Sequence, residues 1–112
     1  MCGIWGEVGV FEGNERSSND LLKIQKLLSI RGKDSSNTLV RKGVQLIHSR
    51  LRLSGDAGHG VQPVETEDGR YFILFNGEIY NLKELSRAYS ISNKFGDTYL
   101  LERLVVKLGA VE

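Results

Sequence analysis

The sequence has almost none of the cysteine that builds zinc–thiolate sites and disulfide frameworks, and it lacks a long apolar run. It contains one cysteine, Cys2, and one proline, Pro63, among 112 residues. A single cysteine excludes an internal disulfide and the paired spacing of zinc sites. No apolar run approaches the ~18 residues of a membrane span, and the start lacks the pattern of a signal peptide. We therefore expect a cytoplasmic protein whose thiol stays reduced.

The charge balance gives no indication of a polyanionic partner. The formal net charge is +1, so no overall field favours nucleic acid or a membrane surface. A hydrophobic content of 40% and a charged content of 26% are ordinary for a globular chain. The length predicts one small domain. A chain this short buries a limited core, so structure supplied by a partner would matter.

The first third of the chain predicts a strand followed by a helix. Residues 3–11 mix glycine with apolar and β-branched residues, which indicates a strand that another backbone or a ligand approaches closely. A turn is expected over residues 12–15. Leucine and isoleucine then recur at helical spacing over residues 18–30, behind the capping candidates Ser17 and Ser18. Gly32 is suited to a left-handed cap at the end of this helix.

The rest of the chain predicts four more strands and two helices. Strands are expected at 38–40 and 44–48 around a Lys42-Gly43 turn, and His48 falls on the second of them. A glycine- and arginine-rich loop over 50–63, which contains His59, precedes a hairpin of strands 64–66 and 71–75 around Asp68-Gly69. Helices are expected at about 82–89 and 97–108. Clustered strands with separate helices indicate an α+β fold with antiparallel sheet covered by helices.

The most suggestive residue is Cys2. If Met1 is removed, as the small side chain of Cys2 permits, the same residue carries a thiol and a free α-amino group. A nucleophile and a base then sit together, as in N-terminal nucleophile enzymes. The alternative is an inert cysteine near the start of the chain. A cysteine–histidine dyad with His48 or His59 is a weaker alternative, because a papain-like fold needs a much longer chain.

Three further positions carry groups that suit a small zwitterionic ligand. Arg50 ends a strand and can present a planar fork to a carboxylate, although a solvated surface arginine is the default interpretation. Asn76 and Gly77 can direct a carboxamide and an N–H together as an oxyanion hole, or simply form a type I′ turn. Asp97 can hold an ammonium group or cap the last helix, and these two roles are compatible.

Taken together, these segments resemble the class II glutamine amidotransferase domain, and within that class the glutaminase half of asparagine synthetase. The Asn-Gly-Glu-Ile-Tyr-Asn run, combined with Cys-Gly-Ile next to the initiator methionine, is highly specific. The matching residues are Cys2-Gly3-Ile4 with Gly6, Arg31-Gly32 with Asp34, His48 with Arg50-Leu51, Gln62-Pro63, Phe75-Asn76-Gly77-Glu78-Ile79-Tyr80-Asn81, and Asp97-Thr98.

The resemblance implies a four-layer αββα sandwich of the N-terminal nucleophile hydrolase type, incomplete on its C-terminal side. It implies hydrolysis of L-glutamine to glutamate and ammonia through a thioester, with no metal. Carried over by residue, Cys2 is the nucleophile, and its own amine is the base. Asn76 and Gly77 form the oxyanion hole. The glutamine itself is bound by Arg50, Leu51, Glu78 and Asp97.

In this family the ammonia passes to an ATP-dependent domain that activates aspartate, so ATP and magnesium are expected only in a synthetase part that this chain does not contain. The chain also departs from the family pattern at Lys33, where proline is usual, at Tyr99, where glutamate is common, and in a short Leu53-Ser54-Gly55-Asp56 segment.

Because the family's domain continues beyond Glu112, residues 1–112 are expected to be a partial domain. Three interpretations stay open: a truncated product or fragment, one half of a split enzyme, or a non-catalytic amino-acid-binding or interaction subunit. An open sheet edge would favour a homodimer.

Overall fold

The computed structural model describes residues 1–9, 16–52 and 60–110. The chain forms two compact units, Met1–Leu53 and Ser54–Glu112, and each is described by itself. In the described residues the order is strand, helix, four strands and two helices, as the sequence predicts. The sheets are antiparallel, which confirms the α+β class. The predicted turn at 12–15, the Leu53–Asp56 segment and His59 lie outside the described residues.

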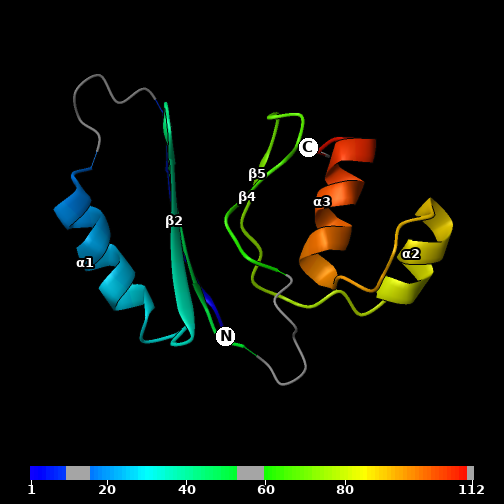
Figure 1. Cartoon of the computed structure of the whole chain (residues 1–112), viewed down its shortest axis with the longest axis horizontal. Coiled ribbons are helices and arrows are strands. Elements are labelled where there is room, and N and C mark those ends of the chain that lie inside the picture. The colour runs from blue at the N-terminus through cyan, green and yellow to red at the C-terminus, as the bar shows by residue number, and fades with distance from the viewer. Residues whose placement is uncertain (10–15, 53–59, 111–112) are drawn as a thin grey trace. The chain divides into compact units, whose positions relative to one another are not determined.

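The first unit is built on a three-stranded sheet of order β1-β3-β2 (Figure 1). Its strands are β1 (Gly3–Val8), β2 (Ser35–Arg41) and β3 (Val44–Arg50). The central strand β3 is buried from Gln45 to Arg50, and the Ile47 side chain is fully inaccessible. The β2–β3 hairpin turns at Lys42-Gly43, as predicted, and the positive φ of Gly43 (74°) suits glycine there.

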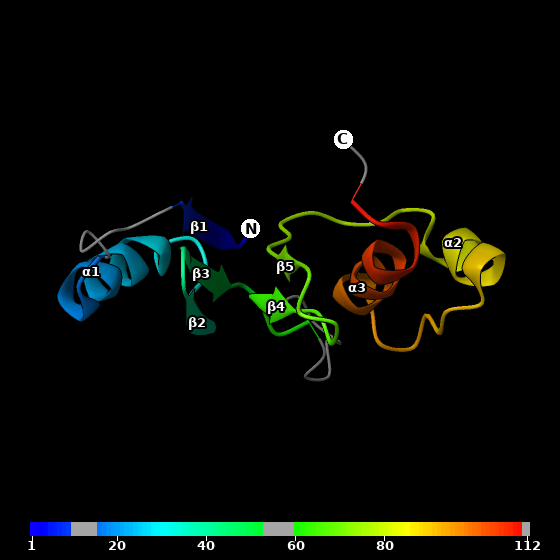
Figure 2. The same cartoon turned by 90° about the horizontal axis from the view of Figure 1, so that it is seen from above.

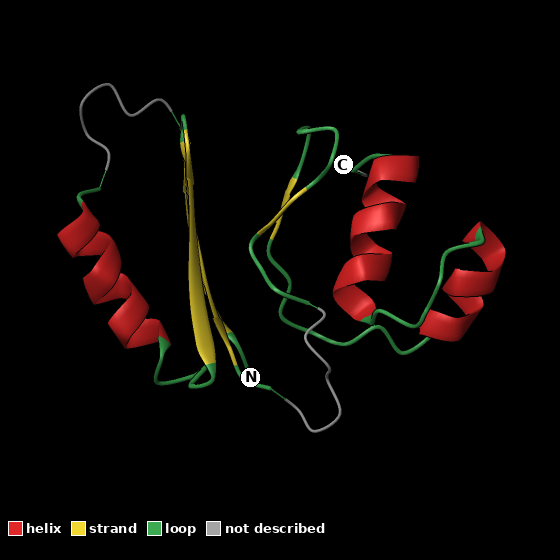
Figure 3. Ribbon diagram, viewed as in Figure 1, coloured by secondary structure: helices red, strands yellow, loops and turns green. Residues whose placement is uncertain are grey.

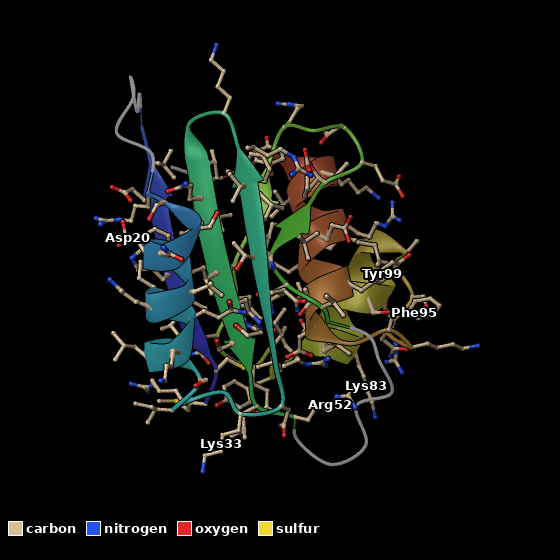
Figure 4. All side chains as sticks on the ribbon, turned by 60° about the vertical axis from the view of Figure 1, so that its left-hand side comes forward. Asp20, Lys33, Arg52, Lys83, Phe95 and Tyr99 are labelled. Atoms are coloured by element: carbon tan, nitrogen blue, oxygen red, sulfur yellow. The ribbon has the colours of Figure 1, made fainter. Side chains whose placement is uncertain are left out.

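Helix α1 (Ser18–Leu28) lies along one face of this sheet (Figure 2). Ser17 is the N-cap, because its hydroxyl accepts a hydrogen bond from the Asp20 N–H at 3.2 Å. Asp20, labelled in Figure 4, places a carboxylate in the first turn, where it complements the helix dipole. The helix ends two residues before the predicted boundary, and Ser29 forms the C-cap.

Gly32 shows why the chain after α1 needs a glycine, and the reason differs from the one predicted. Its φ is not positive, so the predicted left-handed cap is wrong. A Cβ atom at this position would lie 2.0 Å from the carbonyl oxygen of Ser49 and 2.7 Å from the nitrogen of Arg50. Glycine is required because the chain lies directly against the backbone of β3.

The second unit begins with a short hairpin of β4 (Val64–Glu65) and β5 (Phe72–Ile73), shown in yellow in Figure 3. The predicted Asp68-Gly69 turn is confirmed, with Gly69 at φ 67° and its N–H bonded to the Thr66 carbonyl at 2.8 Å. The Thr66 hydroxyl donates to the Asp68 carboxylate at 2.6 Å. This bond, together with the N–H of Arg70, lowers the pKa of Asp68 from its usual 3.8.

Two helices complete the second unit. They are α2 (Leu82–Tyr89) and α3 (Asp97–Leu108), which lie side by side in Figures 1 and 2. Both boundaries match the sequence prediction, including the close of α3 at Gly109, whose N–H bonds to the Val105 carbonyl at 2.8 Å. Leu100 is fully buried on α3. No helix in the described part of the chain has the length and apolar character to span a bilayer.

Tyr99, where the resemblance leads us to expect glutamate, has a packing role on α3. Its ring meets the Phe95 ring edge-on with centroids 4.9 Å apart, and both side chains are labelled in Figure 4. The Arg103 guanidinium lies over the Tyr99 ring at 5.2 Å and also pairs with Glu67 at 3.2 Å. The Tyr99 ring thus packs between Phe95 and Arg103, and the ion pair of Arg103 with Glu67 joins α3 to the β4–β5 turn.

Gly32 is required by a close backbone contact and Gly69 by a positive φ, and these two requirements predict different losses of folding free energy on substitution. Gly32→Ala should destabilise the fold by roughly 3 kcal/mol, because the added methyl overlaps backbone that must move. Gly69→Ala should cost only about 1 kcal/mol, because nothing lies within 4 Å of the new Cβ and only the left-handed backbone is strained. Urea unfolding of both variants checks this, and equal costs would contradict the close approach at Gly32.

The Asp68 carboxylate predicts a defined pH dependence for the hairpin. Because its pKa is lowered in the folded state, its stabilising effect is complete above pH 3.8 and is lost as the pH falls through the folded pKa. Thr66→Val removes the hydroxyl donor and should raise the pKa of Asp68 toward 3.8. NMR titration of the Asp68 carboxyl carbon measures this. Thr38→Val, on exposed β2 surface, should leave that pKa unchanged.

Candidate functional site

The pairing of β1 with β3 brings the start of the chain to the end of a distant strand. Gly3 pairs with Ser49, so Cys2, one residue earlier, lies beside residues 50 and 51. The N–H of Leu51 donates to the Cys2 sulfur at 3.5 Å. Cys2 is half-buried. The sulfur therefore lies next to the backbone that carries Arg50 and Leu51.

The segment after α1 holds this strand end in place. Gly32 lies against the backbone at Ser49 and Arg50. The N–H of Asp34 donates to the Arg50 carbonyl at 3.0 Å, and the Asp34 carboxylate accepts from the N–H of Arg52. Lys33, between them, is exposed and points away from the sheet in Figure 4, so the structure accommodates a lysine at this position. The Arg-Gly-Lys-Asp segment thus positions residues 49–52 from both sides.

Arg50 is not the solvated surface arginine that would be the default. Its side chain is only 6% exposed, and it belongs to the buried central strand. Strand alternation places His48 and Arg50 on the same face of the sheet. His48, 1% exposed, is a sheet residue as expected, and the other histidine lies outside the described residues. Burying a guanidinium is costly unless it is paired or hydrogen-bonded, so its place in the strand is set by the interior of the unit and not by solvent.

The Asn76-Gly77 pair in the second unit does not form a type I′ turn. Such a turn needs positive φ at both central residues, and neither residue has it. Asn76, Gly77 and Glu78 are all exposed and follow the end of the β4–β5 hairpin. We call these three residues the corner. Its polar groups are accessible to a ligand, which is the condition for the predicted oxyanion hole and ammonium contact.

Asp97 is joined to the corner by a long-range hydrogen bond. Its carboxylate accepts from the N–H of Ile79 at 2.7 Å. The predicted N-cap role is wrong, because Gly96 is the N-cap and Asp97 is already the first residue of α3. The carboxylate is used instead to fix the chain directly after Glu78. The two carboxylates assigned to a glutamine ammonium group therefore lie on connected segments.

Gln62 is the polar residue that the sequence interpretation matched but gave no role. Its side chain is 5% exposed. The amide oxygen accepts from the N–H of Phe75, immediately before the corner, and the amide nitrogen donates to the Thr98 hydroxyl at 3.2 Å. The only signal in the sequence is a glutamine directly before the lone proline, and it does not identify the partners.

The structure thus groups the predicted site residues by unit. Cys2, Arg50 and Leu51 come together in the first unit, while the corner and Asp97 come together in the second. The individual roles stay predictions. In the described ranges, no cluster of three or more His, Cys, Asp or Glu side chains is arranged to hold a metal ion.

Comparisons with known proteins bear on the whole chain. The family described as the glutamine amidotransferase domain matches residues 1–110. A probable glutamine-hydrolyzing asparagine synthetase from Schizosaccharomyces pombe is 36% identical over 95 residues, which is 85% of this chain and 17% of the relative.

Two further relatives carry the same printed activity. Asparagine synthetase [glutamine-hydrolyzing] 1 from Saccharomyces cerevisiae is 35% identical over 72% of this chain and 14% of its own length. The Zea mays asparagine synthetase [glutamine-hydrolyzing] is 35% identical over 76% of this chain and 14% of its own length. The chain spans less than a fifth of the length of these relatives. With its whole described length matched, from the cysteine-bearing strand to the last helix, the chain belongs to the glutamine amidotransferase domain family.

Proposed function

We propose that this domain hydrolyses L-glutamine to glutamate and ammonia, with Cys2 as the nucleophile. The observation that carries the proposal is the position of the Cys2 sulfur, 3.5 Å from the N–H of Leu51 and next to the strand end that bears Arg50. The family match supports the substrate. Met1 is 72% exposed, which would leave it open to removal and allow Cys2 to carry the free α-amino group.

In the proposed reaction, the α-amino group takes the thiol proton and the sulfur attacks the side-chain carboxamide carbon of glutamine. An S–C bond forms, and the oxygen becomes an oxyanion that the Asn76 carboxamide and the Gly77 N–H stabilise. The C–N bond then breaks, and the α-ammonium returns its proton to the leaving ammonia. Water attacks the resulting thioester, releasing glutamate and restoring the thiol.

The substrate's own charges suit the remaining residues. The glutamine α-carboxylate would bind the Arg50 guanidinium, which can form two parallel hydrogen bonds, with Leu51 beside it. The α-ammonium would bind Glu78 and Asp97. Asp97 has one oxygen engaged by Ile79, so its second oxygen is the one assigned to substrate.

The wider setting is also part of the proposal. We infer that the two sheets contribute to a four-layer αββα sandwich and that residues 1–112 form part of such a domain. The relatives' printed names support an ammonia acceptor in an asparagine synthetase-type part outside this chain, where ATP would be used. A cytoplasmic location and self-association through a sheet edge belong to the same proposal.

Cys2→Ala tests the nucleophile directly. Glutamine-dependent glutamate release by the purified chain should vanish, because no sulfur is left to form the thioester. Lys83→Ala, on the exposed surface of α2 (labelled in Figure 4), should retain the activity. Intact mass must show that Met1 has been removed from the active material. An inactive parent chain whose melting temperature rises with glutamine would instead favour the non-catalytic amino-acid-binding subunit.

Asn76→Ala tests the oxyanion hole. Removing one such donor should lower kcat by roughly 10² to 10³, because the interaction forms only in the transition state. The KM for glutamine should change little, since the substrate's charged groups still bind. Steady-state kinetics measure both constants. A variant with raised KM and unchanged kcat would assign Asn76 to ground-state binding and remove it from the proposed oxyanion hole.

A further inference from the structure

The β4–β5 hairpin stops pairing at an identifiable residue. Val64 pairs with Ile73 and Glu65 with Phe72, so the next partners in this register would be Pro63 with Leu74 and Gln62 with Phe75. Pro63 has no N–H to donate, and proline is tolerated only where a ladder ends. Beyond Pro63, the N–H of Phe75 is satisfied by the side-chain oxygen of Gln62 instead of a main-chain carbonyl.

The other half of the Gln62 amide continues the connection to α3. Its nitrogen donates to the hydroxyl of Thr98, which is 9% exposed in the first turn of that helix. The neighbouring Asp97 accepts from the N–H of Ile79 at 2.7 Å. The corner is therefore anchored at both ends, at the amide of residue 75 and at the amide of residue 79, and both anchors lead to residues 97 and 98.

From this arrangement we propose that Gln62 is a positioning residue, which fixes the direction of the Asn76 and Gly77 donors by joining Phe75 to Thr98. The inference rests on the proposed function, since it assigns Gln62 a part in the same reaction. Gln62 does not touch the reacting atoms. It acts through the backbone of the corner.

The physical reason lies in how an oxyanion hole works. Its donors lower the activation free energy only if they already point at the developing charge, because reorienting them during the reaction costs free energy that offsets the stabilisation of the transition state. The corner is exposed, so packing does not hold it. Loss of the Gln62 anchor should therefore reduce transition-state stabilisation without removing a substrate contact. The expected signature is a lower kcat with a nearly constant KM.

The test compares three substitutions in the full chain. Gln62→Met removes both hydrogen bonds at similar volume, and Thr98→Val removes one of them. Gln45→Met is the matched control, because Gln45 is 2% exposed and uses both amide atoms on the backbone of Arg16 in the first unit. Each variant is assayed for glutaminase kcat and KM, and its amide hydrogen exchange is measured by NMR.

Gln62→Met is expected to lower kcat by roughly 10- to 100-fold, which is less than deleting a donor outright, with KM changed less than about threefold. The double variant with Thr98→Val should be no slower than Gln62→Met alone, because the two residues act through one connection. Gln45→Met should keep kcat within about twofold at a matched folded fraction. An equal loss of kcat in Gln45→Met would show a general stability effect and overturn the proposal.

Amide exchange separates failure of this inference from failure of the proposed function, because it needs no activity. Exchange at Phe75 should accelerate in Gln62→Met and stay unchanged in Gln45→Met. If Phe75 exchange is unchanged in Gln62→Met, the anchor does not hold the corner and the positioning role is overturned. An inactive parent chain with accelerated Phe75 exchange in Gln62→Met would overturn the glutaminase proposal while retaining Gln62 as the anchor of the corner.

Discussion

The antiparallel pairing of β1 with β3 is the constraint on which the first unit depends. It joins residue 3 to residue 49 and so brings the only cysteine beside Leu51. No local interaction could do this, because the two segments are nearly fifty residues apart in the sequence. The sheet register alone places the sulfur, and slipping it by one residue would turn every side chain of β1 to the opposite face.

The same strand end explains the Arg-Gly-Lys-Asp segment. A backbone that lies against another backbone cannot carry a side chain at the contact, so position 32 must be glycine. Asp34 then bonds to the main chain at Arg50 and Arg52. Arg50 is thus presented from a strand whose backbone is held by its partners β1 and β2 and by the chain after α1.

In the second unit, a side-chain amide and a carboxylate accept the hydrogen bonds of backbone N–H groups that have no main-chain partner. Buried backbone N–H groups require partners, and a ladder interrupted by proline cannot supply them. Gln62 and Asp97 take over at residues 75 and 79. The exposed corner between these residues is consequently anchored without being covered, which keeps its polar groups accessible. Tyr99, the residue after Thr98, packs against Phe95 and Arg103 and not against Gln62 or Ile79 in the contacts that the described residues show.

Local pattern in the sequence was sufficient for the elements and their order. Periodicity predicts α3 at its observed boundaries, the predicted helix at 82–89 matches α2, and the glycine turns mark both hairpins. The predicted hairpin strands 64–66 and 71–75 are too long, since pairing covers only 64–65 and 72–73, and Pro63 accounts for its end before Leu74 and Phe75. The motifs that match the family can also be recognised from the sequence alone, because most of them are short runs of adjacent residues.

Only the tertiary structure decided what several polar residues and one glycine do. The sequence predicts a cap at Gly32, which the structure shows to be a point of backbone contact. It predicts an ammonium contact or an N-cap at Asp97, whose carboxylate accepts from the N–H of Ile79, 18 residues away. Arg50 could be surface or interior on local grounds, and Gln62 carried no signal of its two partners. The reason is physical: local propensity concerns neighbours along the chain, whereas these roles come from backbone groups that meet only after the sheets have formed.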